Sequence, residues 1–283
     1  MMPVLRLLRV GTLFSPAADV VASAAVAQLP WSPDVVRAVV ASVLLYAAGM
    51  VWNDVADRRE DAVHRPERPL PRGDLSLAFA IGLGTTLLAA GLIVSPCLPH
   101  HGLIAVLVLT YDFVAKRAGW LGPVVMGTLR GLNLGTALAV DGAAIATEHR
   151  HALVVAAACY GGYIVAVTIL GIFEDAPNVR PRAVAAVQTA PPLLALCGLW
   201  TVQNGLWPAP AIAAVAAFLF LRGNSRRTSW DRSAIRRSMT FLLLGTMAFT
   251  ALLALAAERP IEAAGIAAVI PAARRISRRI ALT

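Results

Sequence analysis

The stretch VVASVLLYAAGMVWNDVADRREDAVHRPERPLPRG (39–73) changes its chemistry abruptly at residue 53. The fourteen residues before that point carry no charge, as expected for a helix inside a lipid bilayer. Between Asn53 and Asp74, by contrast, lie six of the sixteen acidic residues and five of the twenty-five basic residues of the chain. The stretch therefore predicts a membrane helix that leads into a densely charged segment.

The composition of the whole chain agrees with this prediction. Of the 283 residues, 58% are hydrophobic and 14% are charged, whereas soluble domains carry about 25% charged residues. The mean hydropathy is +0.70, and the apolar runs reach the roughly 20 residues that span a bilayer as a helix. A transmembrane β-barrel would alternate polar and apolar residues, and this chain does not. The predicted fold class is therefore all-α, a polytopic membrane helix bundle.

The bundle is predicted to have about nine transmembrane helices in a single domain, residues 1–283, with a basic tail at 274–283. With the N-terminus in the cytoplasm, seventeen Lys and Arg residues lie on the cytoplasmic side and three on the other. The positive-inside rule favours this orientation and explains the net charge of +9 without a nucleic-acid partner. We therefore predict a multi-pass protein of the inner (cytoplasmic) membrane. The predicted helices are 11–29, 35–52, 75–96, 101–115, 121–146, 152–173, 183–203, 208–222 and 238–257.

The basic tail does not fit nine spans. After an odd number of spans, RRISRR (274–279) would lie on the side away from the other basic segments. The segment 261–273 is too short to cross a bilayer comfortably. Two explanations stay open: an interfacial helix, or a count that is wrong by one span.

Three aspartates in the charged segment are spaced for one helical face. Asp54, Asp57 and Asp61 follow the pattern i, i+3, i+7, and Asn53 lies one turn before Asp57. Carboxylates on one stripe repel each other unless a cation lies between them, and oxygen ligands of this kind suit Mg²⁺ with substrate phosphates. The alternative is a solvated, salt-bridged loop. The arginines that follow can bind phosphate oxygens, and they are Arg65, Arg68 and Arg72.

These motifs resemble the UbiA-type intramembrane prenyltransferase superfamily. NDVADRRED fits its NDxxDxxxD motif, RPLPRG matches the RPLxxG that follows, and YDFVAKR (111–117) resembles its YxxxKR-type element. The resemblance extends over about residues 10–257. The stretch GPVVMGTLRGLNLG (122–135) resembles the EboC-like branch of the superfamily, whose members are described without an assigned substrate.

The resemblance implies a reaction. Mg²⁺ on the aspartates binds the diphosphate of an isoprenyl donor, an allylic carbocation forms in the membrane cavity, and an unidentified acceptor attacks it. An aromatic compound is one candidate for this acceptor. The implied partners are a prenyl diphosphate, a lipophilic acceptor and membrane lipid, while the oligomeric state stays open. Metal and cationic side chains neutralise the leaving diphosphate, and exclusion of water protects the cation. The catalytic residues would be Asp54, Asp57, Asp61, Lys116 and Arg130.

Further residues are candidates for binding the diphosphate. Arg130 and Asn133 lie one turn apart inside the fifth predicted helix, where a charged side chain must face a cavity or a partner. The alternative for Arg130 is a structural pairing with a carboxylate or with helix carbonyls. Asp112 adjoins Tyr111 and can orient it or Lys116. The full diphosphate-binding set is Asn53, Arg68, Arg72, Lys116, Arg117, Arg130 and Asn133.

A second acidic motif, usually DxxxD, is expected from the resemblance near the end of the sixth helix. The matching region reads ILGIFEDAPNVRPR (169–182), in which Glu174 and Asp175 are adjacent. Adjacent side chains on a helix point about 100° apart, so both cannot easily bind one ion. Glu174 is the better candidate for a second Mg²⁺ ligand, with Asp175 beside it.

Two other functions remain open. A UbiA-type terpene cyclase would ionise the same diphosphate and use an internal double bond as the nucleophile. A catalytically weakened protein that binds a lipid or precursor, or assists its export, would explain the unusual second acidic motif. The intact NDxxDxxxD motif favours an enzyme, because binding alone does not need a metal site that ionises a diphosphate.

Overall fold

The computed structural model describes residues 2–282 apart from 176–179, 203–207 and 226–229, and it leaves the side chains of 175, 225 and 277–282 undescribed. The described residues form helices and no strands, so the predicted all-α fold is confirmed. The helices are α1 (Met2–Leu7), η1 (Val10–Thr12), α2 (Phe14–Val26), α3 (Pro33–His64), α4 (Leu77–Val94), α5 (Leu98–Phe113), η2 (Ala115–Arg117), α6 (Leu121–Leu134), α7 (Ala137–Asp141), α8 (Thr147–Asp175), α9 (Pro181–Thr201), α10 (Pro208–Ser225), α11 (Arg232–Ala256) and α12 (Pro260–Leu282).

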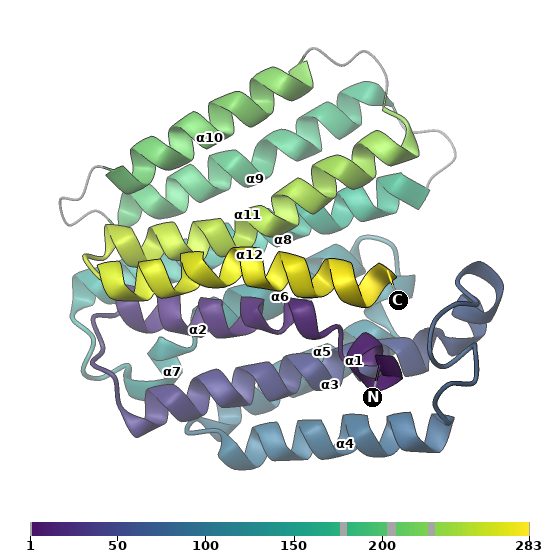
Figure 1. Ribbon diagram of the computed structural model, residues 1–283. Coiled ribbons are helices and arrows are strands. Elements are labelled where there is room, and N and C mark those ends of the chain that lie inside the picture. The colour runs from purple at the N-terminus through teal and green to yellow at the C-terminus, as the bar shows by residue number, and fades with distance from the viewer. Residues whose placement is uncertain (1, 176–179, 203–207, 226–229, 283) are drawn as a thin grey trace.

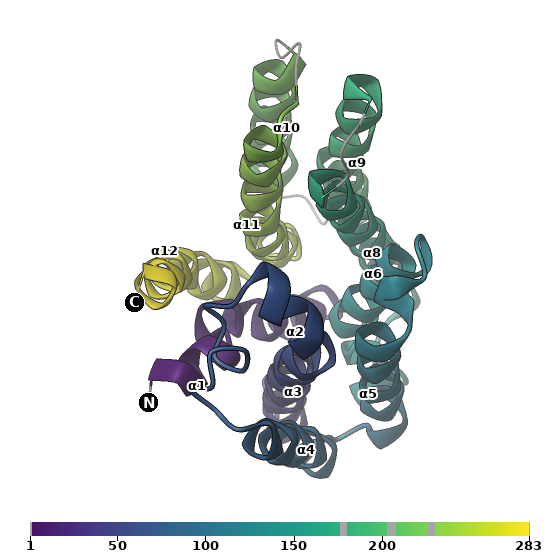
Figure 2. The same ribbon diagram turned by 90° about the vertical axis from the view of Figure 1, so that its right-hand side faces the viewer.

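Successive long helices run antiparallel and lie side by side (Figure 1). In the end-on view of Figure 2, α4 and α10 lie at opposite ends of the cross-section, and α3 lies between α2 and α4. Within the described part of the chain, six helical stretches are long and apolar enough to cross a membrane, which makes this a multi-pass membrane protein. The predicted number of nine is not confirmed, because the apolar helices around α2 and α10 are shorter.

The helix predicted to end at residue 52 continues to His64, so it includes the three aspartates of the charged segment. Ser32 caps its N-terminus by accepting a hydrogen bond from the Val35 amide, and no Pro or Gly interrupts the charged segment. Arg65 leaves the helical region with φ −146°, because the Pro66 ring disfavours a helical residue before it. The three aspartates therefore lie on a rigid helix and not on a loop.

The path of helix α12 shows at which end of the bundle the basic tail lies. It has 23 residues, or about 34 Å of helix, and it packs against α11 and α2. Figure 1 shows it (yellow) running back along the bundle, so that both chain termini lie at the same end. The tail therefore joins the other basic segments, and α12 does not lie across the end of the bundle as an interfacial helix would.

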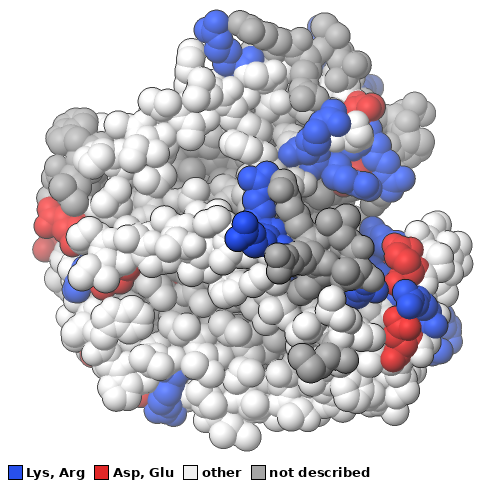
Figure 3. All heavy atoms as spheres, viewed as in Figure 1, with Lys and Arg blue, Asp and Glu red and all other residues white. Residues whose placement is uncertain are grey.

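Charge is unevenly distributed over the surface. In Figure 3, most Lys and Arg spheres of this face lie from its centre toward the end where the two termini lie, and the other half is mostly white except at its edges. An uncharged band between polar ends is the pattern of a surface that faces lipid.

A close helix crossing fixes the position of α6. A Cβ atom added to Gly127 would meet Val165 Cγ2 and would lie 2.5 Å from the carbonyl oxygen of Gly161 on α8. Only glycine allows the two backbones to approach so closely. The crossing holds α6, which carries Arg130 and Asn133, against α8.

We expect both termini to lie on one side of the membrane. In a variant whose native cysteines are replaced, a cysteine at Asp74 and a reporter fused after residue 283 should respond to reagents on the same side. A cysteine at Glu258, in the turn before α12, should respond only from the other side. Modification of the C-terminal reporter and Glu258→Cys from the same side would contradict the path of α12.

We expect Gly127→Ala to lower the free energy of unfolding by about 1–3 kcal/mol, because the new methyl group must push α6 away from α8. Thermal unfolding of the purified protein in detergent measures this change. Gly82→Ala is the matched control, because a Cβ atom there meets nothing within 4 Å. Equal effects of the two substitutions would show that the crossing is not tight.

Candidate functional site

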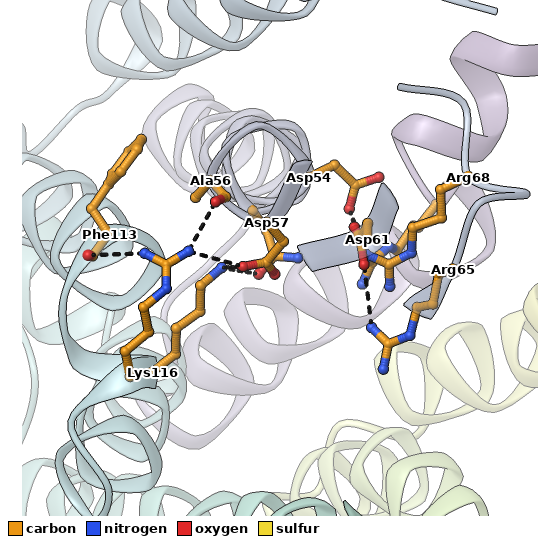
Figure 4. A network of polar contacts seen from close by, with 11 residues as sticks. Asp54, Ala56, Asp57, Asp61, Arg65, Arg68, Phe113 and Lys116 are labelled. Carbon is orange, nitrogen blue, oxygen red and sulfur yellow. Dashed lines mark hydrogen bonds and ion pairs between the residues drawn. The ribbon is translucent and has the colours of Figure 1, made fainter. Parts of the chain in front are cut away.

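The three aspartates of α3 do not all point the same way. Seven residues fall about 20° short of two full helical turns, so Asp54 and Asp61 are nearly aligned. Asp57 is offset from both. Figure 4 shows this division: Asp54 and Asp61 lie near Arg68, while Asp57 points to the Lys116 side of the helix.

Arginines neutralise the aligned pair. Asp54 Oδ1 accepts a hydrogen bond from Arg9 Nη2 at 2.8 Å, and Arg68 Nη1 lies 3.5 Å from the same oxygen. Arg68 Nη1 also donates to Asp61 Oδ2 at 2.5 Å, and Arg65 Nη1 lies 3.8 Å from Asp61 Oδ1. Both carboxylates are buried, at 5% and 3% exposure, so these partners are needed to hold their charges.

Asp57 is neutralised from the other side by the short helix η2. Lys116 Nζ lies 2.6 Å from Asp57 Oδ1 and donates to Asn53 Oδ1 at 3.1 Å. Arg117 Nη2 lies 3.4 Å from Asp57 Oδ1 and donates to the carbonyl oxygen of Ala56 at 2.8 Å. The connection between α5 and α6 is thus held against α3 by charge-assisted hydrogen bonds.

Five cations therefore surround three carboxylates, and the cluster has a cationic surplus. Such a surplus favours a bound anion, while the carboxylates favour a metal ion. Among the described residues, no three His, Cys, Asp or Glu side chains converge closely enough to hold a metal by themselves. Mg²⁺ is usually held by one or two carboxylates, with phosphate oxygens and water completing its coordination. The residues present fit Mg²⁺ bound together with a diphosphate.

A cavity of about 190 Å³ lies directly behind the cluster and shares Arg9 and Asn53 with it. Its other polar groups include Asp112, which is 3% exposed. A larger hollow of about 550 Å³ over the α6–α8 crossing contains none of the predicted site residues. The apolar walls of the smaller cavity include Leu45, Ile104, Val108, Met126 and Leu129.

Arg130 and Asn133 line this cavity, but their polar atoms bind a different carboxylate. Asp19 on α2 is fully buried and lies 2.9 Å from Arg130 Nη2, and it accepts hydrogen bonds from Asn133 Nδ2 and the Tyr160 hydroxyl, each at 2.9 Å. Arg130 Nη2 also donates to the Ser15 and Tyr160 hydroxyl oxygens at 2.5 and 2.6 Å. Arg130 thus makes the structural pairing with a carboxylate that the sequence analysis gave as the alternative to diphosphate binding. Diphosphate binding by Arg130 and Asn133 remains a prediction.

Three other predicted residues lie outside the cluster. Arg72 Nε pairs with Asp74 Oδ1 at 3.3 Å on the surface. Glu174 Oε1 lies 2.6 Å from Arg236 Nη2, so α8 is joined there to α11 by an ion pair. The side chain of Asp175 lies outside the described residues, and metal binding by either acid remains a prediction.

The sequence interpretation missed two members of the site. Arg9 is one of the seventeen basic residues that indicate the orientation of the bundle, and its position 45 residues before Asp54 gives no local sign that it binds this carboxylate. Asp19 is a single acid in an apolar run, which is a signal for a buried partner on another helix. The fold was required to identify Arg130 as that partner.

Comparison with known proteins identifies the relatives of this chain. Residues 13–245 match the UbiA prenyltransferase family. A digeranylgeranylglyceryl phosphate synthase of Methanoculleus marisnigri is 35% identical over 104 residues, which cover 35% of this chain and 37% of that protein. The synthase of Methanopyrus kandleri is 27% identical over 251 residues, covering 76% and 86%. The first curated relatives are thus matched over roughly 28–41% of their length.

Solved structures resemble the whole bundle. A UbiA homolog from Aeropyrum pernix has a TM-score of 0.66 at 19% identity, covering 85% of this chain and 96% of that one. A UbiA homolog from Archaeoglobus fulgidus, bound to GPP and Mg²⁺, has a TM-score of 0.59 at 13% identity, covering 88% and 99%. These likenesses establish a shared fold. The names of the curated relatives support the family and do not support the EboC-like branch.

We expect Asp19→Ala to lower the free energy of unfolding by about 3–5 kcal/mol, because Arg130 would remain charged and buried without its carboxylate. Replacing both partners, as Asp19→Leu with Arg130→Met, should recover part of the loss, since no buried charge is left. Thermal unfolding in detergent compares the two. A double variant no more stable than the single one would show that the ion pair does not account for the effect.

Proposed function

Because the chain belongs to the UbiA prenyltransferase family, we propose that it transfers an isoprenyl group from a prenyl diphosphate to a lipophilic acceptor inside the membrane. The observation that carries the proposal is the cluster of three carboxylates and five cations at the end of an apolar cavity. The cluster suits a metal–diphosphate head group, and the cavity suits the first part of an isoprenyl chain. An enzyme with these two regions side by side can hold both ends of such a donor.

Each side chain of the cluster has a role in this proposal. Asp54, Asp57 and Asp61 are the candidate ligands of Mg²⁺, and because they do not converge on one point, one or two of them would bind the ion together with phosphate oxygens. The bound ion would neutralise negative charge on the diphosphate as its bond to carbon breaks. Lys116 and Arg68 donate to phosphate oxygens, because both already lie at carboxylates where the diphosphate would bind. The apolar walls of the cavity exclude water from the reacting carbon.

The comparisons support the chemistry of the donor more than that of the acceptor. The homolog from Archaeoglobus fulgidus was solved with GPP and Mg²⁺, and the curated relatives are named as synthases of a lipid that carries geranylgeranyl groups. The EboC-like branch stays a prediction that rests on GPVVMGTLRGLNLG (122–135) alone.

The distribution of basic residues indicates on which side of the membrane the site opens. The cluster lies on three of the segments over which the seventeen Lys and Arg residues of the predicted cytoplasmic side are distributed, and basic segments remain in the cytoplasm. We therefore propose that the site opens on the cytoplasmic side of the cell membrane.

A protein that only binds or exports a lipid precursor is the second candidate. It is favoured by Glu174, whose carboxylate is engaged by Arg236 and is 10% exposed. In that case Mg²⁺-dependent binding of a prenyl diphosphate would occur without release of inorganic diphosphate.

We expect Asp57→Asn to lower Mg²⁺-dependent release of diphosphate at least about a hundredfold, because one negative ligand of the metal is lost. The measurement is ³¹P detection of diphosphate from geranylgeranyl diphosphate, with protein in nanodiscs and a lipid extract as the acceptor source. Asp74→Asn is the matched control, since Asp74 is an exposed acid paired with Arg72. Undiminished release by Asp57→Asn would contradict the proposed role of the cluster.

A further inference from the structure

The cavity behind the cluster follows one face of α3 into the bundle. Its α3 wall runs from Asn53, beside the carboxylates, to Ser42, eleven residues earlier on the same helix. The two positions lie about 16 Å apart along the helix axis. Between them, α3 contributes no side chain at Gly49, where a Cβ atom would lie 3.0 Å from Val108 Cγ1 on α5. The depth of the cavity can therefore be measured in turns of α3, starting from the cluster.

Hydrogen-bonded groups from three helices close the deep end of the cavity. Ser42 Oγ donates to Asn133 Oδ1 at 2.5 Å, and Asn133 Nδ2 donates to the carbonyl oxygen of Pro16 at 3.2 Å. Ser42 and Asn133 are 3% and 6% exposed, and all three residues line the cavity. A hydrocarbon chain that separated these groups would leave buried polar atoms unpaired, which is unfavourable. We call Pro16, Ser42 and Asn133 the floor of the cavity.

Two large apolar side chains lie just above the floor. Leu45 on α3 and Ile104 on α5 both line the cavity, and they pack in one hydrophobic cluster at 2% and 6% exposure. Leu45 is eight residues from Asn53, or about 12 Å along α3. The lower part of the cavity is therefore bounded by side chains that are themselves tightly packed.

The depth and the volume of the cavity both limit the length of an isoprenyl chain inside it. An extended isoprene unit is about 5 Å long, because its four chain bonds of roughly 1.5 Å follow a zigzag. Two units that start at the cluster would reach Leu45 and Ile104, and a third would meet the floor. An apolar cavity of about 150 Å³ binds one benzene ring, so the volume of about 190 Å³ suits about two isoprene units and is too small for four.

We propose that the cavity selects a short donor, a prenyl diphosphate with two isoprene units, and that Ile104 and the floor determine this length. The inference rests on the proposed function and names the donor class for the same site. The further units of a longer donor must displace Leu45, Ile104 or the floor, so its reacting carbon is positioned less well beside the cluster. The selected chain is shorter than the geranylgeranyl groups in the names of the curated relatives.

The test varies the length of the donor and the depth of the cavity together. Full-length protein in nanodiscs is given Mg²⁺, a lipid extract as the acceptor source, and dimethylallyl, geranyl, farnesyl or geranylgeranyl diphosphate in turn. The kcat/KM for release of inorganic diphosphate is measured by ³¹P detection. Ile104→Ala deepens the cavity, whereas Ile104→Trp makes it shallower, and thermal unfolding shows whether each variant is folded. Val106→Ala is the matched control, because Val106 is 61% exposed on the same helix and lies outside the cavity lining.

We expect the unsubstituted protein and Val106→Ala to prefer geranyl over geranylgeranyl diphosphate by about tenfold or more in kcat/KM, since units that do not fit cost binding in the transition state. Ile104→Ala should move the maximum to farnesyl diphosphate, because space opens above the floor. Ile104→Trp should move it to dimethylallyl diphosphate, because the indole ring occupies the space of the second unit.

Two results would overturn the inference and leave the proposed function standing. One is release by the unsubstituted protein that is equal for all four donors within about threefold, or fastest with a donor other than geranyl diphosphate. The other is an unchanged order of donors in the folded Ile104 variants. Absence of Mg²⁺-dependent release from every donor by the unsubstituted protein would overturn both the inference and the proposed function.

Discussion

Electrostatic repulsion among three carboxylates on one helix is the constraint on which the site depends. The unbroken helix α3 brings Asp54, Asp57 and Asp61 together, and two of them are almost fully buried. Segments far apart in the sequence neutralise them: Arg9 before α2, Arg68 after α3, and Lys116 on η2. The same cations that make this arrangement stable give it an affinity for anions. A site that binds a diphosphate, as we propose for this one, needs partners of this kind, because they can move from carboxylate to phosphate.

The polar network around Asp19 differs from the carboxylate cluster because its groups pair with one another and leave no surplus charge. Asp19, Arg130, Asn133 and Tyr160 satisfy one another in the interior of the bundle, and they join α2, α6 and α8. The close approach of α6 and α8 at Gly127 and Gly161 brings these partners within hydrogen-bonding distance. Arg130 also lines the cavity, with its guanidinium carbon 5.9 Å from the centroid of the Tyr46 ring. The network therefore shapes the cavity wall while its charges remain balanced internally.

The sequence predicted those features that depend on local pattern. The apolar runs indicated the helices, and the i, i+3, i+7 spacing indicated that one helix carries the three aspartates, although only Asp54 and Asp61 are aligned and Asp57 points to the Lys116 side. Features that depend on distant partners were not predictable in the same way. Asp19 and Arg130 are separated by 111 residues, so only the packing of α2 on α6 reveals their pairing. The path of α12 was missed because its apolar segment looked too short, although its basic end continues the same helix. That Oδ2 of the buried Asp112 has no hydrogen-bond partner among the described residues depends on the side chains around it and has no signature in the sequence.

The most direct test of the central claim is an experimental structure of the protein with Mg²⁺ and a non-hydrolysable prenyl diphosphate analogue. We predict density for the diphosphate between α3 and η2, with the metal on the aspartates of α3. The ammonium group of Lys116 and the guanidinium group of Arg68 should then contact phosphate oxygens, and the isoprenyl chain should enter the cavity lined by Leu45 and Ile104. A diphosphate bound elsewhere, with the Lys116–Asp57 and Arg68–Asp61 pairs unchanged, would contradict the account.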